Sequence, residues 1–176
     1  MNRCNLASLF AIAVTAIGLS LLSSNALAQQ KSLKEQLVGT WTLVSCDVTR
    51  DGTKQPQCAD SNPNGILIFD ASGRYATMTA ARGRPKFSSG NRPALAAEEY
   101  KAAAMGLVAN FGTWLVNEAD KTITTHIEGA LFPNVEGADV KSTVSLSGDE
   151  LKLTTPSPAS ATDQAVWRRA KQSRAD

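Results

Sequence analysis

His126 is the only histidine of the chain, and it stands two residues before Glu128 in the segment TITTHIE, residues 122–128. The segment alternates in a way that is typical of a β-strand, so the two side chains share one face. An imidazole beside a carboxylate could transfer a proton in an isomerase or cyclase. Ile123 and Ile127 occupy the other face and favour the solvent side for His126. A solvated or structural residue, a ligand contact and a catalytic base all stay open as roles for His126.

Further side chains could complete a binding site around this strand. The turn-rich segment EGALFPN, residues 128–134, follows the histidine directly, and such loops often carry binding residues. An arginine, a tyrosine hydroxyl or an asparagine amide there could orient a carboxylate or a carbonyl. The candidates for ligand contacts, besides His126, are Arg74, Tyr100, Trp114, Phe132 and Asn134.

The sequence offers little else that could carry catalysis. It contains no Gly-x-Ser-x-Gly nucleophile elbow, no phosphate-binding loop and no histidine-rich metal spacing. Cys46 and Cys58 with a single histidine make a poor zinc set. We therefore expect no metal, no cofactor and no catalytic residue unless His126 and Glu128 act as a pair.

The first 28 residues have the pattern of a cleaved export signal. Arg3 gives a positive start, residues 9–22 are apolar, and the sequence NALA at 25–28 supplies the small residues of a cleavage site. A retained membrane anchor is the alternative, but a spanning helix wants about 20 apolar residues and Ser23 ends this run. We expect a mature protein that begins near Gln29, is periplasmic or secreted, and has no stable membrane insertion.

The mature chain is nearly neutral and has the length of one domain. Cleavage leaves 176 − 28 = 148 residues with 17 basic and 16 acidic side chains, because Arg3 is the only charged residue removed. The sequence has no stripe of basic residues with interleaved aromatics, so nucleic acid is not expected as a partner. An exported chain meets an oxidising compartment, so Cys46 and Cys58 are predicted to form a disulfide.

Most of the mature chain alternates with a period of two residues, which predicts β-strands. Short turns such as ASG at 71–73 separate several of these segments and predict three hairpins, at 65–80, 111–128 and 140–155. The predicted strands are residues 39–48, 65–70, 74–80, 111–117, 122–128, 140–147, 150–155 and 164–170.

One segment has helical character. Residues 94–109 are rich in alanine, with Pro93 before them and acidic residues near their start, which suits the N-terminal end of a helix. The small residues on its face predict close packing against a sheet or at the mouth of a barrel. The preceding loop, 82–92, is long enough to act as a flap there, and disorder is the alternative.

Eight antiparallel strands favour a closed up-and-down barrel, because closure removes exposed strand edges. An open sandwich is the alternative. Such a barrel can hold one small ligand. The expected division is a cleaved segment 1–28, an N-terminal segment 29–35, a barrel domain 36–170 and a disordered tail 171–176. The residues expected to point inward are Leu43, Met78, Trp114, Val144 and Leu153.

From about residue 36 to residue 169 the chain resembles the bacterial lipocalin-like domain family, within the calycin group of barrels. The resemblance is carried by LVGTWTLVS, GILIFDASGRYATMT, EEYKAAAMG, NFGTWLVNEADKTITTHIEGALFPN and VWRR. It implies an eight-stranded barrel and binding of a small, hydrophobic or aromatic molecule. The resemblance does not imply a particular ligand.

Gly-Thr-Trp occurs twice, at 39–41 and at 112–114. We interpret both copies as strand entries, in which Gly39 or Gly112 allows a tight approach and the tryptophan two residues later points inward. In the family that the chain resembles, an arginine from the end of the barrel covers the first tryptophan. Arg168 or Arg169 would be that residue over Trp41, in a cation–π contact worth about 0.5 to 2 kcal/mol.

The sequence alone leaves three hypotheses for the function of the protein. The first is an exported protein that binds a small, largely apolar molecule in its barrel. The second is an isomerase or cyclase that uses His126 and Glu128. The third is an envelope interaction protein with a filled barrel and an exposed apolar patch.

Overall fold

The computed structural model describes residues 31–56, 64–157 and 161–171, all within the unit Lys31–Asp176. The predicted export signal lies outside the described residues, and so does Cys58. Cleavage and the Cys46–Cys58 disulfide therefore stay predictions.

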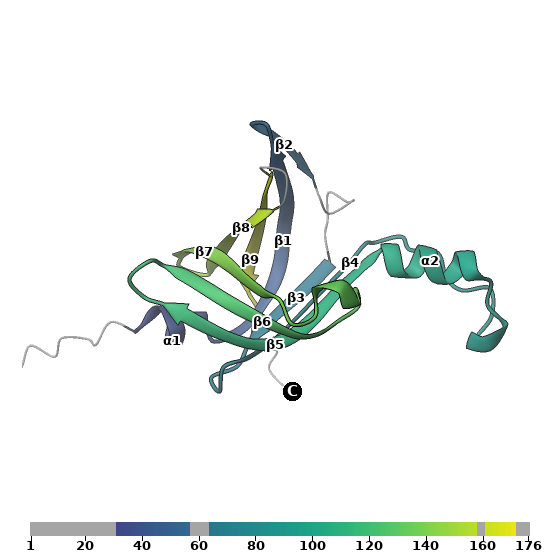
Figure 1. The fold of residues 1–176 in the computed structure, drawn as a ribbon, viewed down its shortest axis with the longest axis horizontal. Helices are drawn as coiled ribbons and strands as arrows, with labels where there is room; N and C mark the ends of the chain where they lie inside the picture. Colours follow the sequence, from purple (N-terminus) through teal and green to yellow (C-terminus); the bar gives the residue numbers. More distant parts are fainter. Residues whose placement is uncertain (1–30, 57–63, 158–160, 172–176) are drawn as a thin grey trace, which may run out of the picture. The chain divides into compact units, whose positions relative to one another are not determined.

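The described chain is a closed antiparallel barrel (Figure 1). Each strand pairs with the next along the chain, and the first pairs with the last, through Trp41 opposite Arg169 and on to Thr49 opposite Thr162. Eight strands form the ring, while β2 extends only the far end of β1 as a hairpin. The strands are β1 (Gly39–Arg50), β2 (Thr53–Pro56), β3 (Asn64–Phe69), β4 (Arg74–Ala80), β5 (Leu107–Asn117), β6 (Thr122–Ala130), β7 (Asp139–Ser147), β8 (Glu150–Ser157) and β9 (Ala161–Arg169).

The predicted barrel and its three hairpins are confirmed. The predicted helix was too long, since α2 (Ala97–Met105) ends at Gly106 and β5 already begins at Leu107. Two elements of the structure were not predicted, β2 and the short helix α1 (Leu33–Leu37).

Helix α1 closes one end of the barrel, which we call the floor. Leu33 and Leu37 are buried in the core. Glu118, at the turn after β5, accepts hydrogen bonds from the backbone N–H groups of Leu33 at 2.9 Å and Lys34 at 3.0 Å. This carboxylate satisfies two of the N–H groups that the start of a helix leaves unpaired. The floor is thus tied to the β5–β6 hairpin.

Trp41 forms the centre of the floor and is completely buried. Its indole N–H donates to the Leu37 carbonyl at 2.9 Å, and the Arg169 guanidinium lies 4.1 Å from its ring centroid. Arg169 also donates to the carbonyls of Val38 and Gln36, at 3.1 and 2.6 Å. Of the two candidate arginines, Arg169 therefore takes the position over Trp41.

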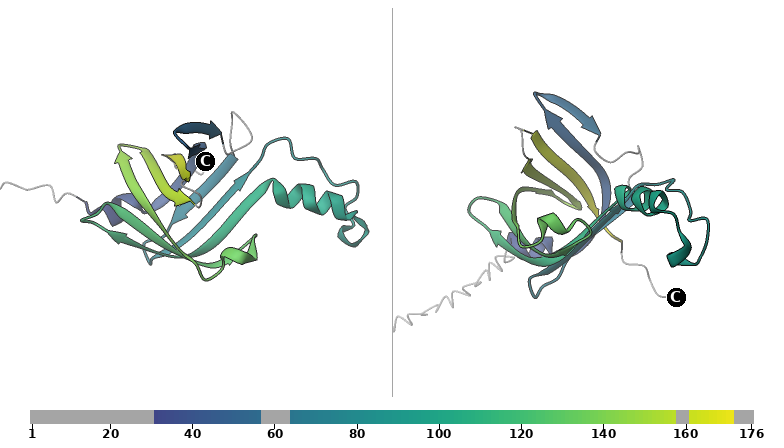
Figure 2. Two further views of the ribbon diagram at one scale, coloured as in Figure 1. Left: turned by 45° about the horizontal axis from the view of Figure 1, so that its top comes forward. Right: turned by 45° about the vertical axis from the view of Figure 1, so that its right-hand side comes forward.

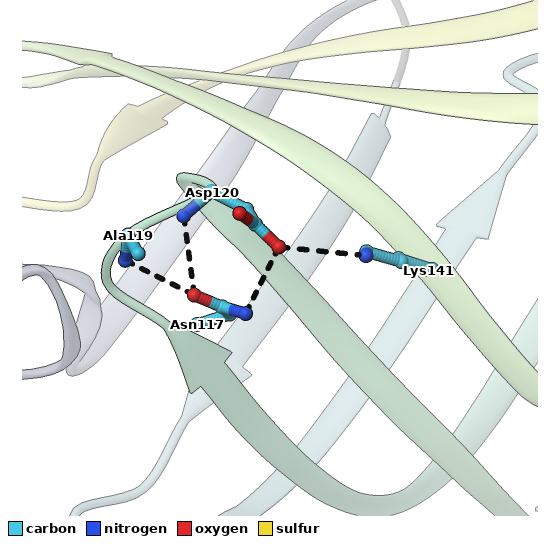
Figure 3. Close-up of polar contacts among 4 residues, drawn as sticks. All are labelled: Asn117, Ala119, Asp120 and Lys141. Atoms are coloured by element: carbon cyan, nitrogen blue, oxygen red, sulfur yellow. Dashed lines mark hydrogen bonds and ion pairs between the residues drawn. The ribbon is translucent and has the colours of Figure 1, made fainter.

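A polar network holds the β5–β6 turn beside the floor (Figure 3). The Asn117 side-chain oxygen accepts from the N–H groups of Ala119 and Asp120, at 3.0 and 3.1 Å. Its amide nitrogen donates to the Asp120 carboxylate at 2.9 Å, and Lys141 on β7 lies 3.9 Å from the same carboxylate. These contacts fix the turn that carries Glu118.

Residues 81–106 form an arm at the other end of the barrel, which we call the open end (Figure 2). Its loop lies along α2, with the rings of Phe87 and Tyr100 5.9 Å apart and the Ser88 N–H donating to Glu99 at 2.7 Å. Helix α2 has no buried residue, so the predicted packing against the sheet is wrong. The arm does leave the barrel where a flap was expected, between β4 and β5.

Candidate functional site in the barrel interior

The inner wall is apolar near the floor. Strand alternation points every second side chain inward, and closure packs these side chains together. Trp114 stacks against Phe69 with ring centroids 4.6 Å apart, and its indole N–H donates to the Asp70 carbonyl at 3.1 Å. The inward residues at this end are all buried and comprise Trp41, Leu43, Leu67, Phe69, Trp114, Ile123, Val144, Leu151 and Trp167.

Towards the open end the inner wall changes character. Polar side chains occur there at the same alternation on β4 through β9, with the buried Ile127 and Ala161 among them. We call this set the polar belt: Tyr75, Asn110, Thr125, Ser142, Thr155 and Asp163.

Two pairs of the belt are hydrogen-bonded. The Tyr75 hydroxyl donates to the Asn110 side-chain oxygen at 2.9 Å. Burial raises the pKa of the Tyr75 hydroxyl above its usual value, and a hydrogen bond with Thr125 opposes this rise. The hydroxyls of Ser142 and Thr155 lie 2.7 Å apart. These contacts leave Tyr75 as a neutral donor on the inner wall.

Asp163 lies opposite Thr155 on β8 and Val48 on β1, so its side chain shares the inner face. Its Oδ1 atom is buried and has no hydrogen-bond partner among the described residues. Trp167 lies four residues further along the same face of β9. Its buried indole N–H also has no hydrogen-bond partner within the described part of the chain. Buried polar atoms of proteins are nearly always hydrogen-bonded, so each such atom requires an explanation.

The belt end is open to solvent, whereas the floor is closed. Inward residues near the floor are buried, but Asn110, Thr125 and Thr155 on the belt are partly exposed. We call this interior, which is apolar at the floor and partly exposed at the belt, the cup. Such a cup can hold a molecule that is apolar at one end and polar at the other.

His126 and Glu128 lie outside this cup. Ile123 and Ile127 occupy the interior, which agrees with the solvent interpretation of the strand. The His126 side chain is 48% exposed, with Nδ1 2.8 Å from an Asp139 carboxylate oxygen.

Glu128 is held by Arg74 on the same outer surface. The guanidinium donates to both carboxylate oxygens, at 2.6 and 2.8 Å. This hydrogen bonding holds the pKa of Glu128 below its usual value. A carboxylate that is stabilised in its charged form is a poor general base.

The structure does not gather the predicted ligand contacts into one site. Tyr100 is exposed on the arm, while Phe132 and Asn134 are exposed on the segment after β6. Arg74 and His126 face outward, and only Trp114 faces the interior. The ligand contacts of these six residues stay predictions.

Met78 points outward, so its predicted inward orientation is wrong. Tyr75 on β4 is buried inside, and alternation then places Thr77 inward and leaves Met78 47% exposed. Leu43, Trp114 and Val144 are buried inside as expected, and Leu153 packs against them.

Met78 belongs to an apolar patch on the outside of β3, β4, β5 and the end of β6. Cross-strand pairing places Ile66 opposite Met78, and Ile68 and Phe111 on either side of Ala76. The patch includes a shallow groove of about 550 Å³ that also reaches Leu131. We call it the outer apolar face: Ile66, Ile68, Ala76, Met78, Phe111 and Leu131.

Sequence reasoning missed the polar belt, although a signal was present. Asn110 precedes Trp114 by four residues, and Asp163 precedes Trp167 by four, so each shares a face with a tryptophan. Thr125 lies between Ile123 and Ile127 with the same alternation. Counting outward from the buried aromatics would have found the belt.

Two further features are missing from the described residues. No group of three or more His, Cys, Asp and Glu side chains there could hold a metal ion. Within the same residues, no helix is long and apolar enough to cross a membrane.

Comparison with known proteins gave a family, and solved structures that include two designed barrels. The family described as lipocalin-like domain matches residues 38–173. A redesigned β-barrel is 14% identical with a TM-score of 0.41, covering 80% of this chain and 100% of its own. A de novo designed fluorescence-activating β-barrel is 11% identical with a TM-score of 0.41, covering 80% of this chain and 99% of its own. No curated protein matches. On the match over residues 38–173, the chain belongs to the lipocalin-like domain family.

Proposed function

We propose that this protein binds a small, largely apolar molecule inside its barrel. The observation that carries the proposal is the cup, in which an apolar floor lies below a partly exposed polar belt. The fold of the family is suited to small-molecule binding in general. The floor would take the apolar part of the ligand, and the belt would take its polar group.

We also propose that the protein works after export, as a periplasmic or secreted protein with a Cys46–Cys58 disulfide. Support comes from the leader pattern and from the two cysteines that remain after cleavage. Intact mass of the exported protein under non-reducing conditions tests both points. Two free thiols, or a mass that includes residues 1–28, would contradict the proposal.

Native mass spectrometry of protein purified without detergent tests the binding function. A co-purified small molecule, or saturable binding of an added aliphatic probe, is the expected result. Leu153→Trp should fill the cup and weaken binding about tenfold or more, because Leu153 is on the inner wall. Lys152→Trp, on the outer side of the same strand, is the matched control and should bind as the wild type does.

The interaction protein is the second candidate, because the outer apolar face is exposed over four strands. Apolar patches of this kind often mark protein contacts. The first partner to test is a second copy, since a two-fold axis would cover the same face on both subunits. Sedimentation velocity over a concentration series should then show a dimer that Met78→Lys abolishes. A monomer at every concentration contradicts this candidate.

A further inference from the structure

We infer that the polar belt selects ligands whose polar end is a hydrogen-bond donor, a protonated amine above all, with the Asp163 carboxylate as the acceptor. This inference rests on the proposed function, because it names the chemistry of a ligand inside the same cup. It concerns the polar end of the ligand only.

The orphaned oxygen of Asp163 is the first argument. A buried carboxylate oxygen without a partner is unfavourable by a few kcal/mol, so a donor that reaches it is strongly favoured. No donor of the described residues lies within hydrogen-bond distance of this oxygen, although the Thr155 hydroxyl stands on the opposite strand. An ionised carboxylate accepts hydrogen bonds and donates none. The group that completes the site must therefore be a donor.

The arrangement of charges is the second argument. None of the six ion pairs among the described residues includes Asp163, and four of them belong to Arg74, Lys54 and Lys141 on the outer surface and to Arg169 at the floor. Hydrogen bonds to a charged donor are about twice as strong as neutral ones. An ammonium group thus gains more at Asp163 than a hydroxyl does, and a carboxylate is repelled.

The position of Asp163 in the cup is the third argument. It lies four residues above the buried Trp167 on the same face of β9, between the apolar floor and the open end. An alkyl chain that reaches the floor would leave its terminal group at the belt. Tyr75, Asn110 and Thr125 line other strands at this level and can accept or donate further hydrogen bonds.

Three probes with one alkyl chain separate the head groups: decylamine, decan-1-ol and decanoate. At about pH 7 the amine is protonated, since alkyl ammonium groups have a pKa near 10. Titration calorimetry of the full mature protein should show decylamine binding about tenfold or more tightly than decanol, with decanoate weakest. Equal affinities for amine and alcohol would overturn the inference while leaving the proposed function intact. No saturable binding of any probe would overturn both.

Asp163→Asn is the decisive variant, because it keeps the shape of the side chain and removes its charge. Decylamine affinity should fall to that of decanol, whose own affinity should change by less than about threefold. Asp47→Asn is the matched control, since Asp47 lies on the outer side of neighbouring β1, 2.9 Å from Lys54. It should keep the full preference for the amine. A preference that survives in Asp163→Asn, or is lost equally in Asp47→Asn, overturns the inference.

The melting temperature keeps this test independent of folding. Asp163→Asn removes the charge from a partly buried side chain whose Oδ1 lacks a partner, so the variant should be at least as stable as the wild type. A large loss of stability would mean that Asp163 has a structural partner, which also contradicts the inference.

Discussion

The inner face of β4, β5 and β6 carries several polar side chains, and the outer face of these strands carries large apolar ones. In a barrel surrounded by water the opposite distribution is expected. The inner face carries Tyr75, which pairs with Phe69 near the floor, and farther along Asn110 and Thr125, whereas the outer face carries Met78 and Phe111. Near the floor the usual order holds, with Trp114 inside. Polar side chains are thus mixed with apolar ones on the inner face, where Asn110 and Thr125 are partly exposed and Ile127 is buried. Polar residues inside a barrel are typical of ligand contacts, and apolar residues outside it are typical of contacts with another protein.

The largest effect should come from the floor. Trp41→Ala should lower the free energy of unfolding by about 3 to 5 kcal/mol, because it removes a fully buried indole and leaves a cavity. Denaturant titration followed by circular dichroism measures it. Phe111→Ala, an aromatic truncation on the outer face, is the contrast and should cost much less. An unchanged midpoint for Trp41→Ala would contradict the role of the floor.

A smaller loss of stability is expected at the bulge between Phe111 and Gly112, where the backbones of β5 and β6 lie close together. A Cβ on Gly112 would lie 1.9 Å from the backbone oxygen of His126, so the strands must separate to accommodate it. Gly112→Ala should therefore cost about 1 to 3 kcal/mol, as overpacking does. Gly90→Ala meets no atom within 4 Å and serves as the control. Equal melting temperatures for the two variants would refute the tight approach.

The neighbouring arginines of β9 provide a third comparison. Arg169 covers Trp41 and bonds two carbonyls, whereas Arg168 is exposed on the other side of the strand. Arg169→Ala should cost about 0.5 to 2 kcal/mol through the cation–π contact, with more from the hydrogen bonds. Arg168→Ala should stay within about 0.5 kcal/mol of the wild type. Thermal unfolding of the two variants side by side checks the order, and the reverse order would show that the floor is closed in another way.

The smallest effect concerns the outer ion pair. Because Arg74 lowers the pKa of Glu128 below 4.5, the pair stabilises the fold above that pH and is lost as the pH falls through the lowered value. The melting temperatures of wild type and Glu128→Gln should differ slightly at neutral pH and converge in acid. Glu98→Gln removes an exposed carboxylate that lies outside this pair, 4.0 Å from Lys101, and is the matched control. A gap for Glu128→Gln that widens in acid would contradict the assignment.

The strands could be predicted from the sequence because their apolar residues repeat with a period of two. The short helix α1 and the inward polar residues were missed. Strand alternation and turn residues gave the barrel and its hairpins, and the arginines after Trp167 were placed near Trp41. Helix α1 has only five residues, too few to show a helical period. The end of α2 did have a signal, because Gly106 follows Met105 directly.

The orientation of Met78 and the polar belt were missed for one physical reason. Sequence reasoning assigns apolar residues to the interior, whereas polar side chains line part of this inner wall and Met78 and Phe111 are exposed on the outside. Asp163 also looks like an ordinary strand residue in the sequence. Its orphaned oxygen appears only when β8 and β1 are placed on either side of it.

The pairing of β1 with β9 has a consequence for how the chain is made. Val38 and Arg169 are 131 positions apart, so the first strand leaves the ribosome long before its partner exists. Until then β1 has an unpaired edge, and such edges promote association between chains. A protein whose contacts are this far apart in the sequence also folds slowly, in about milliseconds to seconds. A chain truncated before residue 161 should therefore remain an open, aggregation-prone sheet, however complete its other strands are.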